Sequence, residues 1–330
     1  MLVHLRLTVP TDLAQPVTHL LEHHECVTNL VILRGACVDP KGDLIECDVA
    51  RETASELLDS LTKLGLGEQG GIVLSRPSST PFKRAVELEE AAPGEPDDAV
   101  IWDAVLNDAE DASQPTLSFY LFLLMATILA AIAVITDSAV LVVGAMVVGP
   151  DFAAVASICT GIVFARWHLV WRSARLLLVS FAFAILVVAL LGLIARGTGL
   201  ITPADVTAPR PQTGFIWHPD VWSFLVALVA GSAGVLAMST DKTSAMVGVF
   251  ISVTTVPAAG NLALGLATWE RSEIAGSVQQ LAVNLAGMIL AGVTTLALQR
   301  VGWHHVMRYS ARLLGRGPSR PRHPHYMRRG

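Results

Sequence analysis

The feature that most constrains this chain is a series of long apolar runs that begins at Ser118 and continues to Gln299. An α-helix of about 20 apolar residues is long enough to cross the hydrocarbon core of a bilayer. Only 15% of the 330 residues are charged, and the mean hydropathy is +0.55, whereas about a quarter of the residues in ordinary soluble domains are charged. The sequence therefore predicts an integral membrane protein.

The apolar runs predict an α-helical membrane bundle of about six transmembrane helices. Their approximate bounds are 118–136, 138–165, 176–195, 221–238, 244–268 and 278–299. Lys and Arg in short loops favour the cytoplasmic side of a membrane. The second and fourth connections and the tail carry Arg166, Arg172, Arg175, Lys242 and several arginines, whereas the opposite connections carry Arg196, Arg210 and Arg271. We therefore expect a multi-pass protein of the cell inner (plasma) membrane with both termini in the cytoplasm.

Charge divides the chain into four predicted segments: a head of residues 1–77, an acidic linker of residues 78–117 with one short amphipathic helix, a transmembrane domain of residues 118–299, and a basic tail of residues 300–330. The first 117 residues hold 21 of the 28 acidic residues and 8 of the 23 basic ones, while the tail holds eight arginines and no acid. An acidic head repels phosphates, so no nucleic-acid partner is expected. The basic tail is expected to lie against anionic lipid.

The head alternates strand-like and helix-like patterns in the order βαββαβ, which is typical of ferredoxin-like α+β domains. No signal peptide is evident at its start, so we expect the head in the cytoplasm. Fold alone does not establish ligand binding. The head could bind a small metabolite, or it could serve dimerisation or docking. A homodimer is one possible assembly of the protein.

Two of the apolar runs contain a proline at a similar depth. Pro150 lies 12 residues after Ser138, and Pro257 lies 13 residues after Ser244. A proline at that depth removes a backbone hydrogen bond and bends or breaks the helix. The two runs are the second and fifth, so the bundle is predicted to consist of two inverted three-helix units with broken middle helices. Such a pair marks the central site of many transporters, although the bends could also serve packing.

Polar residues near the two breaks are the candidate site. Asp151 follows the first break directly, and an ionisable group at that depth suggests a proton or cation site; the alternative is that it caps the next half-helix. Asp137 and Asp241 precede the two Ser-Ala starts and are expected to cap them, with gating as the alternative. The candidate substrate- or ion-binding residues are Gly149, Pro150, Asp151, Thr254, Thr255, Pro257, Asn261 and Asn284.

These motifs resemble a known family. The sequence from Asp137 to Ala139, the triplet Gly144 to Met146, Gly149-Pro150, the stretch 230–234, Pro257 and Asn284 are similar to the signature of the domain-of-unknown-function 389 family of bacterial and archaeal hydrophobic membrane proteins. The resemblance covers roughly residues 100–301 and implies a helical membrane domain, for which a ferredoxin-like head is a common companion. It implies no activity. Asp151 stands where the family usually has an apolar residue.

The leading hypothesis is a secondary transporter or channel for a small solute or ion, with its site at the broken helices. The alternative is a membrane-anchored sensor whose head binds a metabolite. An enzyme is not expected, because intramembrane hydrolysis would need a nucleophile with its base or two facing carboxylates, and Asp151 has no evident acidic partner inside the predicted membrane region. No cofactor and no metal site are predicted.

Overall fold

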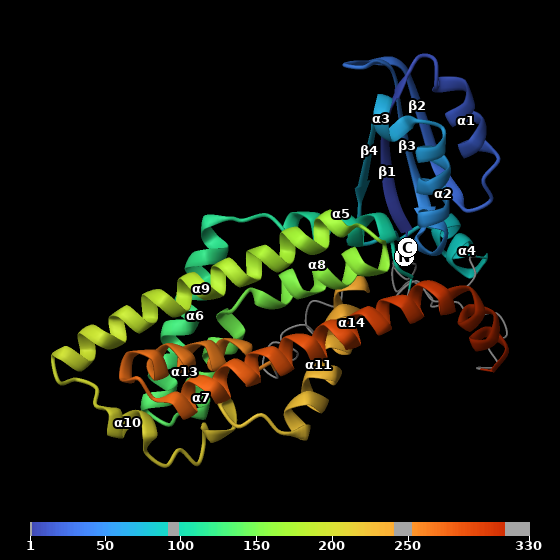
Figure 1. Cartoon of the computed structure of the whole chain (residues 1–330). Helices are drawn as coiled ribbons and strands as arrows, with labels where there is room; N and C mark the ends of the chain where they lie inside the picture. Colours follow the sequence, from blue (N-terminus) through green and yellow to red (C-terminus); the bar gives the residue numbers. More distant parts are fainter. Residues whose placement is uncertain (1, 92–98, 241–252, 314–330) are drawn as a thin grey trace, which may run out of the picture. The chain divides into compact units, whose positions relative to one another are not determined.

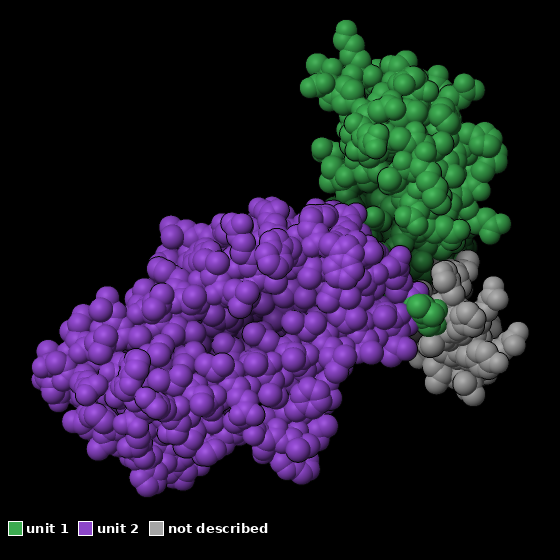
Figure 2. Space-filling view, viewed as in Figure 1, with its two compact units in different colours: residues 1–103, 301–330 green, residues 104–300 purple. Residues whose placement is uncertain are grey.

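The computed structural model describes residues 2–91, 99–240 and 253–313, which fall into two compact units (Figure 2). The first unit comprises the described residues of 1–103 and 301–330, and the second comprises residues 104–300.

The first unit is built on an antiparallel four-stranded sheet with the strand order β2-β3-β1-β4 (Figure 1). Its strands are β1 (Leu2–Pro10), β2 (Val27–Val38), β3 (Lys41–Ala50) and β4 (Gly71–Ser75). Helix α1 (Ala14–Glu22) follows β1, and helices α2 (Arg51–Lys63) and α3 (Leu66–Gln69) connect β3 to β4. The predicted βαββαβ order is therefore present, with α3 as a short addition.

Alternation along the strands separates a helix-covered face from an open face. In β1, Leu5 and Leu7 are fully buried, whereas Arg6 between them is exposed. Leu57 and Leu61 of α2 are also fully buried. Successive residues of a strand point to opposite faces, so one face forms the core with the helices. The opposite face carries polar pairs such as His4 and Asp48, whose Nδ1 and Oδ1 atoms lie 2.9 Å apart.

The predicted linker contains more helix than the sequence indicated. Helix α4 (Lys83–Ala91) was not expected, and its Ala85 and Leu88 pack in one buried cluster with Leu2 and Ala50. The expected amphipathic helix is α5 (Trp102–Ala112), whose Val105, Leu106 and Ala109 are buried. Most of α5 belongs to the second unit.

The second unit is a bundle of apolar helices (Figure 1). Its elements are α6 (Leu117–Ile135), α7 (Ala139–Val148), α8 (Asp151–Val163), α9 (Trp167–Gly197), α10 (Pro203–Thr207), the 3-10 helix Gly214–Ile216, α11 (Val221–Ser239), α13 (Thr255–Thr268) and α14 (Arg271–Leu313), whose last residues belong to the first unit. Among the described residues, four helices are long and apolar enough to cross a membrane: α6, α9, α11 and residues 271–302 of α14. Helices α7 and α8 are bent by 51° at Gly149-Pro150 and would make a fifth span together.

Several expected span boundaries differ from the structure. Helix α9 begins at Trp167, so Arg172 and Arg175 lie within a helix and not in a connection. Helix α14 begins at Arg271, which was likewise expected in a loop. Only the second half of the fifth run is described, as α13; its predicted first half lies mostly in residues 241–252, outside the described residues.

The helices of the second unit recur with a constant spacing of 104 residues. Val221 of α11 lies 104 residues after Leu117 of α6, Thr255 of α13 after Asp151 of α8, and Arg271 of α14 after Trp167 of α9, and each of these residues begins its helix. With this spacing Pro150 corresponds to Thr254. The expected match of Pro150 with Pro257 is therefore wrong by three residues.

The turns also recur with this spacing. Ala165 after α8 and Trp269 after α13 both have positive φ, of 54° and 65°. Just after them, the amide of Arg166 donates to the Gly161 carbonyl at 2.8 Å, and the amide of Glu270 donates to the Gly265 carbonyl at 2.9 Å. The same left-handed turn, a common helix ending, thus closes both half-helices.

Two arginines tie the recurring segments together reciprocally. Arg196 at the end of α9 donates to the carbonyl of Ala267 in α13 at 3.0 Å. Arg300 in α14 donates to the carbonyl of Val163 at the end of α8 at 2.7 Å. Both donor and acceptor positions are 104 residues apart, so the second contact repeats the first with the two halves of the bundle exchanged.

Glu52 in the first turn of α2 allows a test of the head. Both of its carboxylate oxygens are buried without a hydrogen-bond partner among the described residues, and burial raises the pKa of Glu52 above its ordinary value. The folded head therefore binds this proton more tightly than the unfolded chain, and its stability should fall as the pH rises through the raised pKa. Glu52→Gln should stabilise the head at neutral pH and remove this dependence.

Hydrogen exchange of the β1 and β3 amides in the full-length protein measures this effect. Glu56→Gln, which removes an exposed carboxylate from the same helix, is the control and should leave the pH dependence unchanged. An identical pH profile for Glu52→Gln and the unaltered protein would contradict the assignment.

Candidate functional site

The starts of α8 and α13 meet inside the bundle, and we refer to this meeting point as the central contact. The Thr255 hydroxyl donates to Asp151 Oδ2 at 2.5 Å. A Cβ atom at Gly149 would lie 2.6 Å from Val256 Cγ2, so only glycine fits there without displacing Val256. The two segments that the sequence singled out, around Pro150 and around Pro257, are therefore in direct contact.

Asp151 is the acidic group of the central contact. It is 4% exposed, and no Lys, Arg or His side chain of the described chain pairs with it. It is the first residue of α8 and not its N-cap, which is Pro150, so the capping interpretation is replaced by the bond to Thr255 on another helix. A negative charge in the first turn is favoured by the helix dipole.

One face of α14 carries a line of buried polar residues, which we name the α14 stripe: Glu273, Ser277, Gln280 and Asn284, each at most 3% exposed. Spacings of three and four residues place them on one side of a helix. Thr254, the residue before α13, accepts bonds from Gln280 Nε2 at 3.0 Å and Asn284 Nδ2 at 2.5 Å. Gln280 Oε1 is buried and has no hydrogen-bond partner in the described chain.

The contacts along α14 show how the two half-helices lie. Asn261 of α13 bonds Ser277, and Thr254 at the start of α13 bonds Asn284. The end of α8 reaches Arg300. The half-helices α13 and α8 therefore follow one another along α14 and point in opposite directions, with their N-terminal ends meeting near its middle.

The predicted site residues are thus only partly brought together. Gly149, Asp151 and Thr255 form the central contact, Pro150 is the N-cap of α8, and Thr254 joins Asn284. Pro257 is the third residue of α13. Its missing N–H is harmless there because the first N–H groups of a helix have no intrahelical partner.

Asn261 belongs to a second cluster that sequence analysis missed, the Arg210 cluster. Arg210 Nη2 lies 2.6 Å from Glu273 Oε1 in an ion pair whose side chains are 4% and 2% exposed. Arg210 Nη1 donates to Asn261 Oδ1 at 2.7 Å, and Asn261 Nδ2 donates to Glu273 Oε2 and to Ser277 Oγ, both at 2.8 Å. Arg210 was expected to be an ordinary loop residue; the helical spacing of Glu273 with the rest of the stripe was the available signal.

The segment that carries Arg210 is also held by Asp137. The Asp137 carboxylate accepts bonds from the Thr213 amide and hydroxyl, both at 2.9 Å. The expected cap role is taken instead by Ser138, whose hydroxyl accepts from the Leu141 amide. Asp241, the other expected cap, lies outside the described residues. Asp137 therefore fixes the loop between the two halves of the bundle.

A second segment covers the equivalent position in the first half. Ser157, 104 residues before Asn261, donates its hydroxyl to the Ala109 carbonyl of α5 at 2.8 Å. Glu110 of α5 pairs with Arg166 Nη1 at 2.5 Å. The residues before α6 and those before α11 thus each cover the matching position of one half-helix.

The fold and this geometry define an α-helical bundle with a broken apolar helix pair, which is compatible with a membrane protein. Residues 146–290 match the model of the family described as Domain of unknown function (DUF389), so the predicted family is confirmed for this part of the chain. An uncharacterised protein of Methanocaldococcus jannaschii is 25% identical over 244 residues, which are 72% of each chain. No solved structure matches.

The buried Arg210–Glu273 ion pair leads to a prediction about the stability of the protein. Glu273→Gln leaves Arg210 buried without a counter-charge and should lower the free energy of unfolding by about 3 kcal/mol. The double change Arg210→Met with Glu273→Leu should be more stable than Glu273→Gln alone, because no charge is then stranded. Unfolding of the purified full-length protein in mixed detergent measures both.

Arg271→Gln, which neutralises an exposed charge in the same turn of α14, serves as the matched control. A loss below about 1 kcal/mol for Glu273→Gln, the range of exposed pairs, would mean that this pair is solvated.

Proposed function

We propose that this protein is a secondary carrier of the cell inner membrane that moves a small anionic solute together with a proton. The observation that carries the proposal is the central contact, where two oppositely directed half-helices meet with their N-terminal ends at Asp151 and Thr255.

The recurrence at 104 residues supports two structural repeats. Each repeat would consist of a span, a broken span and a third span: α6, α7 with α8, and α9 in the first, and α11, the run ending in α13, and α14 in the second. An odd number of spans inverts the second repeat relative to the first. Asp151 and Thr255 are equivalent positions and touch each other, so they would lie on the pseudo-two-fold axis.

Electrostatics favour an anion with a proton. Each helix N-terminus carries roughly half a positive charge, so two converging ends attract an anion. The ionised Asp151 carboxylate offsets both ends. A proton on Asp151 would cancel its charge and leave the meeting point positive, which admits an anionic substrate. The Asn284 and Gln280 side chains nearby supply polar contacts for it.

The two covering segments support alternating access. On one side Arg210 binds Asn261 and Glu273, and on the other side α5 binds Ser157. Because these are equivalent positions in inverted repeats, the two covers would close opposite membrane faces. Release of one cover at a time would open the central contact to one side only.

Location and partners complete the proposal. The proposal places both termini in the cytoplasm, with the acidic head and the basic tail there and the tail against anionic lipid. A homodimer through the open face of the head sheet is the proposed assembly, since that face exposes Val31, Leu33 and Val73. The carrier itself is complete within one chain in this proposal.

Inversion of the repeats predicts opposite labelling. Single cysteines at the equivalent turn positions, Ala165→Cys and Trp269→Cys, in a variant without native cysteines, should react with an impermeant maleimide from opposite sides of sealed vesicles. Both positions are exposed, so both should react once the vesicles are permeabilised. Labelling of both from one side would contradict the inverted arrangement.

Proton coupling at Asp151 predicts a specific transport defect. Proteoliposomes with the purified protein should accumulate one or more small anions from a panel of organic acids and inorganic anions, faster under an inward proton gradient. Asp151→Asn should abolish the stimulation by the gradient while the protein stays folded, because Asn cannot carry the proton. Asp59→Asn, an exposed carboxylate of the head, is the control.

Other outcomes separate the alternatives. Uptake of alkali cations or neutral polyols, but not anions, would overturn the electrostatic argument. Anion flux whose proton dependence survives Asp151→Asn would move the proton site elsewhere. No flux from well-folded protein, together with metabolite binding to the head, would favour the membrane-anchored sensor.

A further inference from the structure

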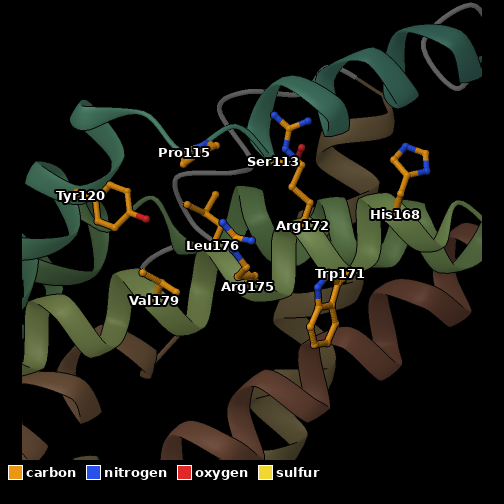
Figure 3. Close-up of a pocket in the computed structure, with 9 residues that line it drawn as sticks. All are labelled: Ser113, Pro115, Tyr120, His168, Trp171, Arg172, Arg175, Leu176 and Val179. Atoms are coloured by element: carbon orange, nitrogen blue, oxygen red, sulfur yellow. The ribbon is translucent and has the colours of Figure 1, made fainter.

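A pocket of about 470 Å³ opens on the second unit, between the connection from α5 to α6 and the first turns of α9 (Figure 3). Its polar lining includes Ser113, Tyr120, His168, Arg172 and Arg175. It lies apart from the central contact and shares no residue with it.

The charge of this pocket is uncompensated. Arg172 donates to the neutral amide of Gln114, and Arg175 has no hydrogen-bond or ion-pair partner among the described residues. No acidic residue is part of the lining. Arg166, six residues before Arg172, is by contrast paired with Glu110. Two guanidinium groups and an imidazole without a carboxylate form a site for an anion, and guanidinium groups suit phosphate oxygens in particular.

The position of the pocket along α9 indicates where this anion would come from. The apolar residues 176–195 are already long enough to cross the hydrocarbon core, so Trp167 to Arg175 would extend into the headgroup region. Trp167 and Trp171 are 67% and 73% exposed, as expected of an aromatic belt at that depth. The pocket continues to Leu176 and Val179, so it offers cations at one end and apolar surface at the other.

The recurrence in the bundle shows that helix packing does not require this basic pocket. The residues 104 positions after His168, Arg172 and Arg175 are Ser272, Gly276 and Gln279. The Trp217 carbonyl lies against Gly276, 2.1 Å from where a Cβ atom would be, so the chain itself covers the equivalent place. The cations are therefore a property of the first half alone.

We propose that this pocket binds the phosphate headgroup of an anionic phospholipid. Arg172 and Arg175 bind the phosphate oxygens, the Tyr120 hydroxyl binds the rest of the headgroup, and Leu176 and Val179 contact the start of an acyl chain. The proposal requires that α9 crosses a membrane, but it does not depend on transport.

Native mass spectrometry of the full-length protein in detergent tests this site. Phosphatidylglycerol and phosphatidylcholine with the same acyl chains are titrated separately, and the bound lipids per chain are counted. The unaltered protein should bind one phosphatidylglycerol about 30-fold more tightly than phosphatidylcholine, from two cations near an anionic headgroup. The double change Arg172→Gln with Arg175→Gln should abolish this preference for that one lipid.

Two further double variants serve as controls for this test. Arg172→Lys with Arg175→Lys keeps the charge and should retain most of the preference. Arg34→Gln with Lys63→Gln removes two exposed charges from the head and should retain all of it. Size-exclusion profiles identical to that of the unaltered protein establish that each variant is folded.

Three results would overturn the proposal. The first is an unchanged preference in the double Gln variant, which would assign anionic lipid binding to another region such as the basic tail. The second is equal binding of the two lipids by the unaltered protein. The third is displacement of the lipid by millimolar inorganic phosphate, which would make this a site for a soluble anion.

Discussion

The bundle depends on how the backbone groups at the break between α7 and α8 are buried within the protein. Proline at position 150 cannot donate, and the first N–H groups of α8 have no partner within the helix. Such groups are costly in contact with lipid and are tolerated where protein surrounds them. Burying them against the start of α13 satisfies this condition and brings Asp151 to Thr255. The small residues Gly149 and Gly234 permit the close approach of α13 and of Phe152, respectively.

The same constraint explains why a carboxylate is tolerated so deep in an apolar bundle. An isolated buried charge is expensive, yet Asp151 occupies the first turn of α8 and receives a hydroxyl bond from the first turn of α13. Two helix ends of equal sign placed side by side repel each other unless a negative group lies between them. Asp151 therefore stabilises the meeting of the half-helices, and in the proposed carrier it is also the group that takes up the proton.

The sequence predicted the helices and strands better than it predicted which residues of the two halves of the bundle correspond. Apolar runs and a mid-helix proline are local signals, so α6, α11 and the break at Gly149-Pro150 were predicted correctly, as was the βαββαβ order of the head. Proline was a misleading marker for comparing the halves, because Pro257 lies within the first turn of α13, where it is tolerated, and the helix start is at Thr255. Only the constant spacing of helix ends and turns corrects the correspondence from Pro257 to Thr254.

The Arg210 cluster could not be predicted from the sequence, for a different reason. Arg210 and Glu273 are 63 residues apart, and a lone arginine in a polar connection reads as a solvated charge. Its burial depends on how the connection folds back, which no periodicity records. Glu273 did carry a signal, since it continues the spacing of Ser277, Gln280 and Asn284, but this line becomes visible only when the start of α14 is moved back to Arg271. Contacts between residues that are distant in sequence could be identified only from the structure.

Departures from the 104-residue recurrence are as informative as the recurrence itself. Helix starts, turns and the Arg196 and Arg300 contacts repeat, so they belong to the structural framework that both halves share. The covers do not repeat: one is the amphipathic helix α5 and the other an irregular loop held by Asp137 and Arg210. A carrier with identical covers would open to both sides with equal ease. In the proposed carrier, different covers would give the two openings different free energies, and a preferred resting state would then follow from residues outside the repeated core.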